Sequence, residues 1–432
     1  MNRYSVLLLI LLLLNHCSLD QKTGIWNESR TTQKNNSKTV KNLFVKEPAI
    51  SNEFNKNLKI KLDTNNNTKN NNYNNSNNES RFLFDKSLEN ISKIKFSKID
   101  NFNKFDPNIL VENNGIVFFD NKGSIFKLNK NLEIKWKKNY YTKSEIKSKP
   151  LLLFGSYKNT LIVTDNLSNY YAIDLNSGKL LWTKKSYAPF NSEIKFHQGN
   201  FFLIDIENTI RGFSLIDGSE LWNFKTDSSF VKSQKKNSMI IINKDIYTNN
   251  SNGDITALNI RNGNLKWQIS STSNELYDNL FLLKNSNLVA DEGSIYFSNN
   301  QNTFFSLDIE NGFINWKQKI NSDLKSSIID NMVFSVTVEG FLVITDKLSG
   351  NIIRVTNIFN RFNKKKKIKP VGFVVGINSI YVATDNGRLI IVDINSGKTK
   401  SIIKITNSKI SRPYIYEQNL FIAKNNSIVK LN

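Results

Sequence analysis

The sequence predicts an all-β protein: an eight-bladed β-propeller of four-stranded antiparallel blades, preceded by a disordered N-terminal tether. Three observations predict this architecture. A hairpin motif recurs along the chain with a period of roughly 40–50 residues, which is typical of propeller blades. The chain stops three strands into its last repeat. An Asn-rich tract separates the repeats from an apolar leader, which divides the chain into residues 1–16, 17–80 and 81–432.

The clearest copy of the motif is Tyr170–Trp182, which reads YYAIDLNSGKLLW. Apolar residues alternate along its first half, and this alternation predicts a half-buried strand. Gly178 then supplies the positive φ that a tight hairpin turn requires, because it has no Cβ to clash. A second strand ends at Trp182. An isolated hairpin is only marginally stable in water, so we expect these hairpins to stack against one another.

Seven segments keep this frame: Ile125–Trp136, Tyr170–Trp182, Ile210–Trp222, Ile255–Trp267, Phe304–Trp316, Leu342–Arg354 and Leu389–Ser401. The five that retain the aromatic residue supply Trp136, Trp182, Trp222, Trp267 and Trp316. We expect each indole to pack between neighbouring blades, where it buries a large apolar area. A stacking platform for a planar cofactor is the alternative. The Asp or Asn ahead of each turn is expected to accept hydrogen bonds from backbone amides across that turn.

The first blade is predicted to begin at Ile109, and the last has only three strands: Tyr414–Tyr416, Leu420–Ala423 and Ser427–Leu431. Because an exposed sheet edge favours aggregation, we expect the N-terminal segment Lys93–Ile99 to supply the missing fourth strand and close the ring. A seven-bladed ring with the C-terminal strands as an appendage is the alternative.

Residues 1–16 contain a single positive charge and a short apolar run, which indicates a secretory leader rather than a membrane span. Cys17, the only cysteine, follows directly, and this order resembles a bacterial lipoprotein signal. The resemblance implies lipidation of Cys17, and Ser18 after it implies sorting to the outer membrane. His16 departs from the small residue expected before the cysteine, so ordinary secretion with a chance cysteine is the alternative. Thr64–Glu79 is a low-complexity, Asn-rich tract that cannot bury enough apolar area to fold, and it predicts a flexible tether or a neutral expansion.

The net charge of +22 favours acidic partners such as anionic lipid, nucleic acid or an acidic protein surface. A compositional bias towards Lys and Asn explains the same number. Secretion and the absence of a recognised RNA-binding motif argue against nucleic acid.

Catalytic motifs are absent from the sequence: there is no HExxH, no P-loop and no Gly-x-Ser-x-Gly. His197 is the only histidine after the leader, and a lone histidine is more often structural than catalytic. Asp205 and Glu207 are expected to lie on one strand and to cap a blade edge. We therefore expect a protein that is not an enzyme, with no metal and no cofactor.

The segments Ala172–Trp182 and Ala257–Trp267 resemble the repeat A-x-D-x-x-[ST]-G-x-x-x-W of PQQ-type propellers. Within that superfamily, quinoprotein dehydrogenases hold PQQ against a vicinal disulfide and a Ca²⁺ ion, and this sequence has neither a Cys-Cys pair nor a matching ligand set. The BamB-like lipoproteins fit the whole layout of leader, cysteine, tether and eight blades. This resemblance implies a non-enzymatic scaffold on the periplasmic face of the bacterial outer membrane. The alternatives are a PQQ-dependent dehydrogenase-like quinoprotein and a propeller that binds the cell envelope.

The same resemblance implies docking on a BamA-type outer-membrane assembly protein, and contact with nascent outer-membrane proteins. A loop after the third motif contributes to docking in that family, and Phe230, Val231 and Lys232 are the corresponding residues here. An acidic pair in the next loop also contributes, but the corresponding stretch Leu282–Asn287 has no carboxylate. We therefore expect the partner interface to have diverged from that of the family.

Overall fold

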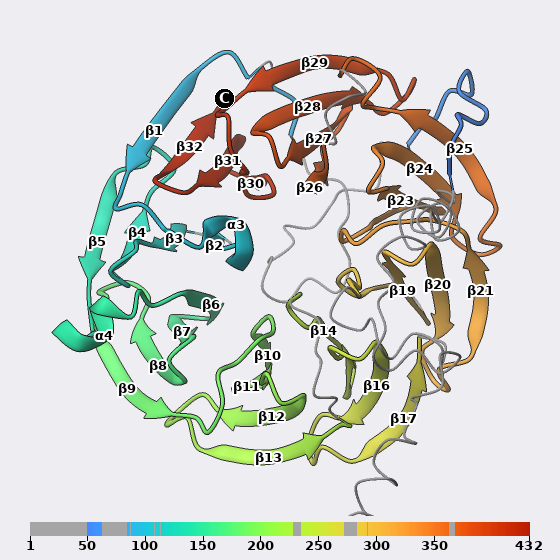
Figure 1. Ribbon diagram of the computed structural model, residues 1–432. Helices are drawn as coiled ribbons and strands as arrows, with labels where there is room; N and C mark the ends of the chain where they lie inside the picture. The colour runs from blue at the N-terminus through green and yellow to red at the C-terminus, as the bar shows by residue number, and fades with distance from the viewer. Residues whose placement is uncertain are drawn as a thin grey trace, which may run out of the picture. The chain divides into compact units, whose positions relative to one another are not determined.

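Eight four-stranded antiparallel sheets form a closed ring in the computed structural model, which confirms the predicted eight-bladed propeller (Figure 1). The structure describes residues 50–62, 84–86, 88–107, 109–112, 114–227, 235–271, 283–291, 293–362 and 368–432. These belong to a unit that runs from Ala49 to Asn432. Cys17 and the docking residues Phe230, Val231 and Lys232 lie outside the described residues, so their roles stay predictions.

Each blade is a meander whose strands follow one another from the centre of the ring outwards (Figure 1). The innermost strands are β2 (Leu110–Glu112), β6 (Leu152–Tyr157), β10 (Lys195–His197), β14 (Met239–Ile242), β18 (Val289–Asp291), β22 (Ser327–Ile329), β26 (Pro370–Val375) and β30 (Tyr414–Tyr416). The second strands are β3 (Gly115–Phe119), β7 (Thr160–Asp165), β11 (Asn200–Ile204), β15 (Asp245–Asn249), β19 (Ser294–Asn299), β23 (Met332–Val336), β27 (Ser379–Thr384) and β31 (Asn419–Lys424).

The third strands are β4 (Ile125–Leu128), β8 (Asn169–Asp174), β12 (Thr209–Ser214), β16 (Asp254–Asn259), β20 (Thr303–Asp308), β24 (Phe341–Asp346), β28 (Arg388–Asp393) and β32 (Ser427–Leu431). The outermost strands are β5 (Ile134–Lys138), β9 (Leu180–Lys185), β13 (Glu220–Lys225), β17 (Leu265–Ser270), β21 (Ile314–Gln318), β25 (Ile352–Asn357), β29 (Thr399–Lys404) and β1 (Ile91–Lys95). Blades 1 to 7 begin at β2, β6, β10, β14, β18, β22 and β26, and blade 8 joins β30–β32 to β1.

Two short helices, α3 (Phe102–Phe105) and α4 (Lys143–Lys147), lie between strands. None of the described helices has the length and apolar composition needed to span a bilayer.

The N-terminal strand β1 closes the ring by pairing antiparallel with β32, in a register that sets Ile91 opposite Leu431 and Lys95 opposite Ser427. This confirms eight blades and excludes the seven-bladed alternative. The regular strand ends at Lys95, earlier than the predicted Ile99. The backbone N–H groups of Phe96 and Ile99 nevertheless donate to carbonyls of the β31–β32 turn, so the chain stays attached to this edge beyond the strand.

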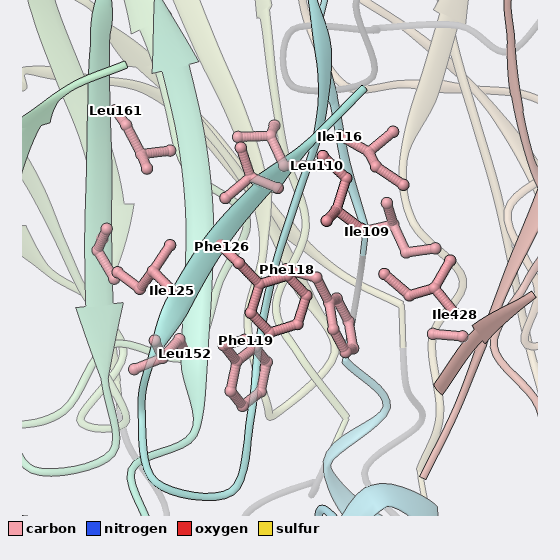
Figure 2. Close-up of a cluster of buried hydrophobic side chains, with 14 of the residues drawn as sticks. Ile109, Leu110, Ile116, Phe118, Phe119, Ile125, Phe126, Leu152, Leu161 and Ile428 are labelled. Carbon is pink, nitrogen blue, oxygen red and sulfur yellow. The ribbon is translucent and has the colours of Figure 1, made fainter. Parts of the chain in front are cut away.

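The prediction that the third strand of each blade is half-buried is wrong. In β8, the residues from Tyr170 to Ile173 are all buried, on both faces of the strand. The reason is that each sheet packs face to face between two neighbouring blades, so both of its faces are core. Figure 2 shows one such cluster, in which Ile428 of blade 8, Phe118 of blade 1 and Leu161 of blade 2 line a shared apolar interior. The outermost strands are exposed instead: in β9 every residue except the partly buried Trp182 is exposed.

Residues 50–62 differ from the tether that the sequence predicts for residues 17–80. The backbone of Phe54 exchanges two hydrogen bonds with Val355 of β25, with N···O distances of 3.1 and 2.9 Å. The N–H of Ile60 donates to the carbonyl of Asn395 in blade 7, at 3.0 Å. Ile60 is buried against blades 6 and 7, and this apolar contact offsets the entropy of ordering a polar segment. The segment therefore lies along the outer edge of the ring, beside β25 (Figure 1).

Asp205 lies in the turn between β11 and β12, not on a strand as the alternation predicts. Its Oδ1 accepts from the backbone N–H groups of Glu207 and Thr209, both at 2.9 Å. Its Oδ2 accepts from Arg211, with an N···O distance of 3.1 Å. The carboxylate therefore fixes a turn, which is a structural role.

Candidate functional site

Five tryptophans on the outermost strands of blades 1 to 5 each bridge to the following blade. Each indole Nε1 donates to a backbone carbonyl in the next hairpin turn, over distances of 3.0 to 3.2 Å. The acceptors in chain order are Leu175, Leu215, Ile260, Ile309 and Lys347. Trp136, Trp182, Trp222, Trp267 and Trp316 thus lie between blades near the circumference, away from the centre of the ring where a planar ligand would bind.

Each indole also lies against the glycine of the next turn. Gly263 has φ +73°, and a Cβ added there would lie 2.5 Å from the ring of Trp222. A Cβ added at Gly218 would likewise lie 2.6 Å from the ring of Trp182. The motif therefore needs glycine for two reasons, the positive φ of the turn and the close approach of the neighbouring indole.

Arg354 occupies the equivalent position at the boundary between blades 6 and 7. Its side chain is fully buried, and Nη2 donates to the carbonyl of Ile394 at 2.7 Å, which corresponds to the carbonyls that the indoles contact. Nη1 donates to Asn395 and, at 3.0 Å, to the carbonyl of Leu58 in the N-terminal segment. Burial lowers the pKa of Arg354 from its usual value, but the residue remains charged. The guanidinium therefore joins three chain segments where an indole would join two.

The motif carboxylates fix the hairpin turns, as the sequence predicts. Asp174 Oδ1 accepts from the N–H and the hydroxyl of Ser177, both at 2.7 Å, and these bonds lower the pKa of Asp174. Asp346 makes the same two contacts with Ser349. In each of these two turns, Oδ1 of the carboxylate is occupied by hydrogen bonds from the turn serine, which is a structural role.

The predicted docking loop is anchored by a polar network where its described N-terminal end leaves blade 3. Thr226 Oγ1 donates to the carbonyl of Asn208 at 3.0 Å, and Asn252 Nδ2 donates to the carbonyl of Asp227 at 2.9 Å. Ser251 Oγ donates to Asn208 Oδ1 at 2.9 Å. These hydrogen bonds connect the β11–β12 turn of blade 3 to the β15–β16 turn of blade 4.

The other end of the same loop leads to a cavity of about 60 Å³ where the innermost strands converge. Its apolar walls include Leu152 and Phe154 of β6. Its charged lining consists of Glu193, Lys236, Lys325 and Arg412, contributed by blades 3, 4, 6 and 8. No sequence pattern singled out these four residues, because they occupy the irregular stretches before the inner strands and no repeat position marks them.

Burial dominates the electrostatics of this cavity. It lowers the pKa of Lys236 to about 8 and also lowers the pKa values of Lys195 and Lys325. Burial opposes ionisation of Glu193, but the charges of Lys195 and Lys325 outweigh it and lower the pKa of that carboxyl. Glu193 Oε2 lies 3.0 Å from Lys195 Nζ, and Oε1 accepts from Asn287 Nδ2 at 2.7 Å.

Among the residues that the structure describes, no group of three or more His, Cys, Asp or Glu side chains could hold a metal ion. His197 lies at the end of β10, partly exposed. The prediction that the protein is not an enzyme stays a prediction.

Comparison with known proteins links this ring to two groups. The sequence model of the family described as outer membrane protein assembly factor BamB matches residues 109–356. The structure of BamB from Moraxella catarrhalis aligns over 79% of this chain and 100% of that chain, with a TM-score of 0.61 and 14% identity. Quinohemoprotein alcohol dehydrogenase from Comamonas testosteroni aligns over 82% of this chain and 78% of that chain, with a TM-score of 0.58 and 10% identity. At these identities, both alignments establish the fold alone.

Two curated relatives are quinoproteins. Quinoprotein alcohol dehydrogenase PedE from Pseudomonas putida is 26% identical over 99 residues, which cover 22% of this chain and 16% of the relative. Quinoprotein ethanol dehydrogenase from Pseudomonas aeruginosa is 26% identical over 98 residues, with the same coverage. The chain thus spans about a sixth of the length of the curated relatives it matches. Since the family match covers more than half of the chain, from the start of blade 1 to the end of blade 6, this protein belongs to the BamB family of PQQ-type propellers.

Proposed function

We propose that this protein is a non-enzymatic scaffold lipoprotein of the outer-membrane β-barrel assembly machinery. It is anchored through Cys17 on the periplasmic face of the outer membrane, docks on a BamA-type protein and assists insertion of outer-membrane proteins. The observation that carries this proposal is the family match over residues 109–356, which includes the loop with Phe230, Val231 and Lys232.

The architecture supports a docking mechanism. A closed ring leaves few free sheet edges, so loops between blades are the elements available to a partner. The loop after blade 3 starts from a base that is held by Asn208, Thr226 and Asn252. A base fixed in this way reduces the conformational entropy lost on binding and so favours affinity.

The proposal is tested by deleting the gene and quantifying outer-membrane barrel proteins. We expect their levels to fall, and to recover when the wild-type gene is restored. A double variant, Phe230→Ala with Lys232→Ala, should fail to restore them, because it removes the aromatic ring and the positive charge that the proposal assigns to docking, and a few residues carry most of the energy of an interface. The matched control is Tyr187→Ala with Lys185→Ala, where blade 2 leads into blade 3: Lys185 is the last residue of β9, and Tyr187 in the following loop is 94% exposed. Normal barrel levels in the deletion strain would count against the scaffold role.

A PQQ-dependent dehydrogenase is the second candidate, and the relatives that are 26% identical over about a fifth of this chain favour it. Purified protein is incubated with PQQ and Ca²⁺ and assayed for cofactor absorbance and dye-linked alcohol oxidation. The scaffold proposal predicts neither signal. Stoichiometric cofactor binding with turnover would replace the scaffold proposal by the dehydrogenase.

A further inference from the structure

The cavity at the centre of the ring concentrates positive charge. Its lining holds three cationic side chains, Lys236, Lys325 and Arg412, and one carboxylate, Glu193. That carboxylate is already engaged by Lys195, which is 1% exposed. The described lining is therefore cationic, even after its own acid is counted.

Carbonyl and aromatic groups contact two of these cations. Lys236 Nζ donates to the backbone carbonyl of Asp106 at 3.1 Å and lies 4.2 Å from the ring centre of Phe105. The guanidinium of Arg412 lies 5.3 Å from the ring centre of Tyr414. The carboxylate of Asp106 pairs with Lys409 at 3.1 Å, and its charge also favours the protonated form of Lys236.

Concentrating like charges in a poorly solvated space is costly. For Lys236 the cost comes from burial, which lowers its pKa to about 8 although the charges of Asp106 and Glu193 favour its protonated form. A bound anion would remove this cost, because it would pair with several cations at once and add charge-assisted hydrogen bonds.

We propose that the central cavity binds a compact oxyanion carrying a phosphate group, held by Lys236, Lys325 and Arg412. The volume of about 60 Å³ suits a group of a few heavy atoms. Carboxylate and phosphate oxygens are the natural partners of a guanidinium, and ammonium groups supply further donors.

Glu193 gives the site a preference among oxyanions. An ionised carboxylate only accepts hydrogen bonds. Phosphate near neutral pH retains a proton and can donate it to Glu193, whereas sulfate has no proton to donate and would meet the carboxylate with lone pairs alone. The site therefore selects phosphate over sulfate. This inference does not depend on the scaffold role, which rests on the family match.

The test is isothermal titration calorimetry of the full-length protein with sodium phosphate and with sodium sulfate, at pH 7 and constant ionic strength. We expect phosphate to bind at least about tenfold more tightly than sulfate, as loss of one charge-assisted hydrogen bond implies. Lys325→Gln with Arg412→Gln should weaken phosphate binding by about tenfold or more. Glu193→Gln should reduce the ratio of phosphate affinity to sulfate affinity, because the amide of Gln can donate a hydrogen bond to sulfate. Lys179→Gln, an exposed charge in a hairpin turn, is the matched control and should change nothing.

Titration with glycerol 3-phosphate separates a free anion from a phosphate carried on a larger molecule. Equal affinities assign the terminal phosphate group as the ligand, and binding of inorganic phosphate alone assigns the free ion. Absence of phosphate binding to the wild-type protein, or unchanged binding to the Lys325/Arg412 variant, overturns the proposal.

A measurement on the wild-type protein avoids reliance on variants that fail to fold. Saturating phosphate should protect Lys236 and Lys325 from acetylation by acetic anhydride, measured by mass spectrometry, while Lys179 reacts at an unchanged rate. Equal reactivity of Lys236 with and without phosphate also overturns the proposal.

Discussion

At the scale of single residues, the blade boundary depends on one contact between an indole and a glycine. Trp222 lies on Gly263 of the next turn and donates to the carbonyl of Ile260 at 3.0 Å. Arg354 shows that the same carbonyl position accepts a different donor when the aromatic ring is lost. The sequence pattern located the glycines and tryptophans from spacing alone. It left the motif ending at Arg354 as a degenerate copy, because no pattern indicates that a cation replaces an indole.

The glycine contact predicts the effect of Gly263→Ala. The new methyl group would lie 2.5 Å from the Trp222 ring, and the turn would hold alanine at positive φ. Gly199→Ala is the matched control, since Gly199 has φ +80° and no atom within 4 Å of the added Cβ. We expect the control to lose about 1 kcal/mol in the free energy of unfolding, and Gly263→Ala to lose roughly 1–3 kcal/mol more through overpacking. Denaturant unfolding measures both, and equal losses would contradict the inter-blade contact.

Lys236 predicts a pH dependence of stability. Burial lowers its pKa in the folded protein to about 8, below the value of 10.5 for the exposed side chain. From about pH 8 to 10 the unfolded chain therefore binds more protons than the folded one, and the free energy of unfolding should rise with pH. Above pH 10 the free energy of unfolding should fall with pH, because burial raises the pKa values of Tyr140 and Tyr381 from 10 to about 12. The folded chain then binds more protons than the unfolded one.

We expect Lys236→Met to reduce the rise between pH 8 and 10, since the titrating amine is gone. Denaturant unfolding in phosphate-free buffer at several pH values measures the slope. An identical slope in wild type and variant would show that Lys236 is not buried as a cation.

At the scale of elements, the hairpin frame and the strand order were predictable, because period-2 alternation and turn glycines are local signals. Closure by β1 was also predictable, since the last repeat lacks a strand. The burial of both faces of β8 was not, because alternation of residue types cannot distinguish one covered face from two. The order of residues 50–62 is not predictable from the sequence for a related reason: their few apolar residues, such as Ile60, pack against a surface that exists only in the closed ring.

Ring closure predicts a specific disulfide. Asn90 and Asn432 exchange two backbone hydrogen bonds, so the alternation of antiparallel pairs makes Lys95 and Ser427 a non-hydrogen-bonded pair with close Cα atoms. In a Cys17→Ser background, Lys95→Cys with Ser427→Cys should oxidise readily and stabilise the ring by roughly 2–4 kcal/mol. Thiol titration and thermal unfolding measure this. Lys95→Cys with Val429→Cys is the register control, and faster oxidation of that pair would contradict the observed pairing.

At the scale of the whole molecule, the formal charge of +22 is distributed over the sequence, but the ring gathers part of it at its centre. Sequence reasoning assigned the charge to composition, because Lys236, Lys325 and Arg412 are far apart in the chain and no local pattern connects them. Their convergence depends on closure of the blades. The cavity therefore exists only in the closed ring, and its lining is drawn from blades that are far apart in the sequence.

The most direct test of the scaffold role is affinity purification of the tagged full-length protein from detergent-solubilised membranes, followed by mass spectrometry. The account predicts recovery of a BamA-type protein with its partner lipoproteins, retention of both in the Tyr187→Ala/Lys185→Ala control, and a loss of about tenfold or more in Phe230→Ala/Lys232→Ala. A clean preparation that lacks the assembly proteins at low salt would contradict the account.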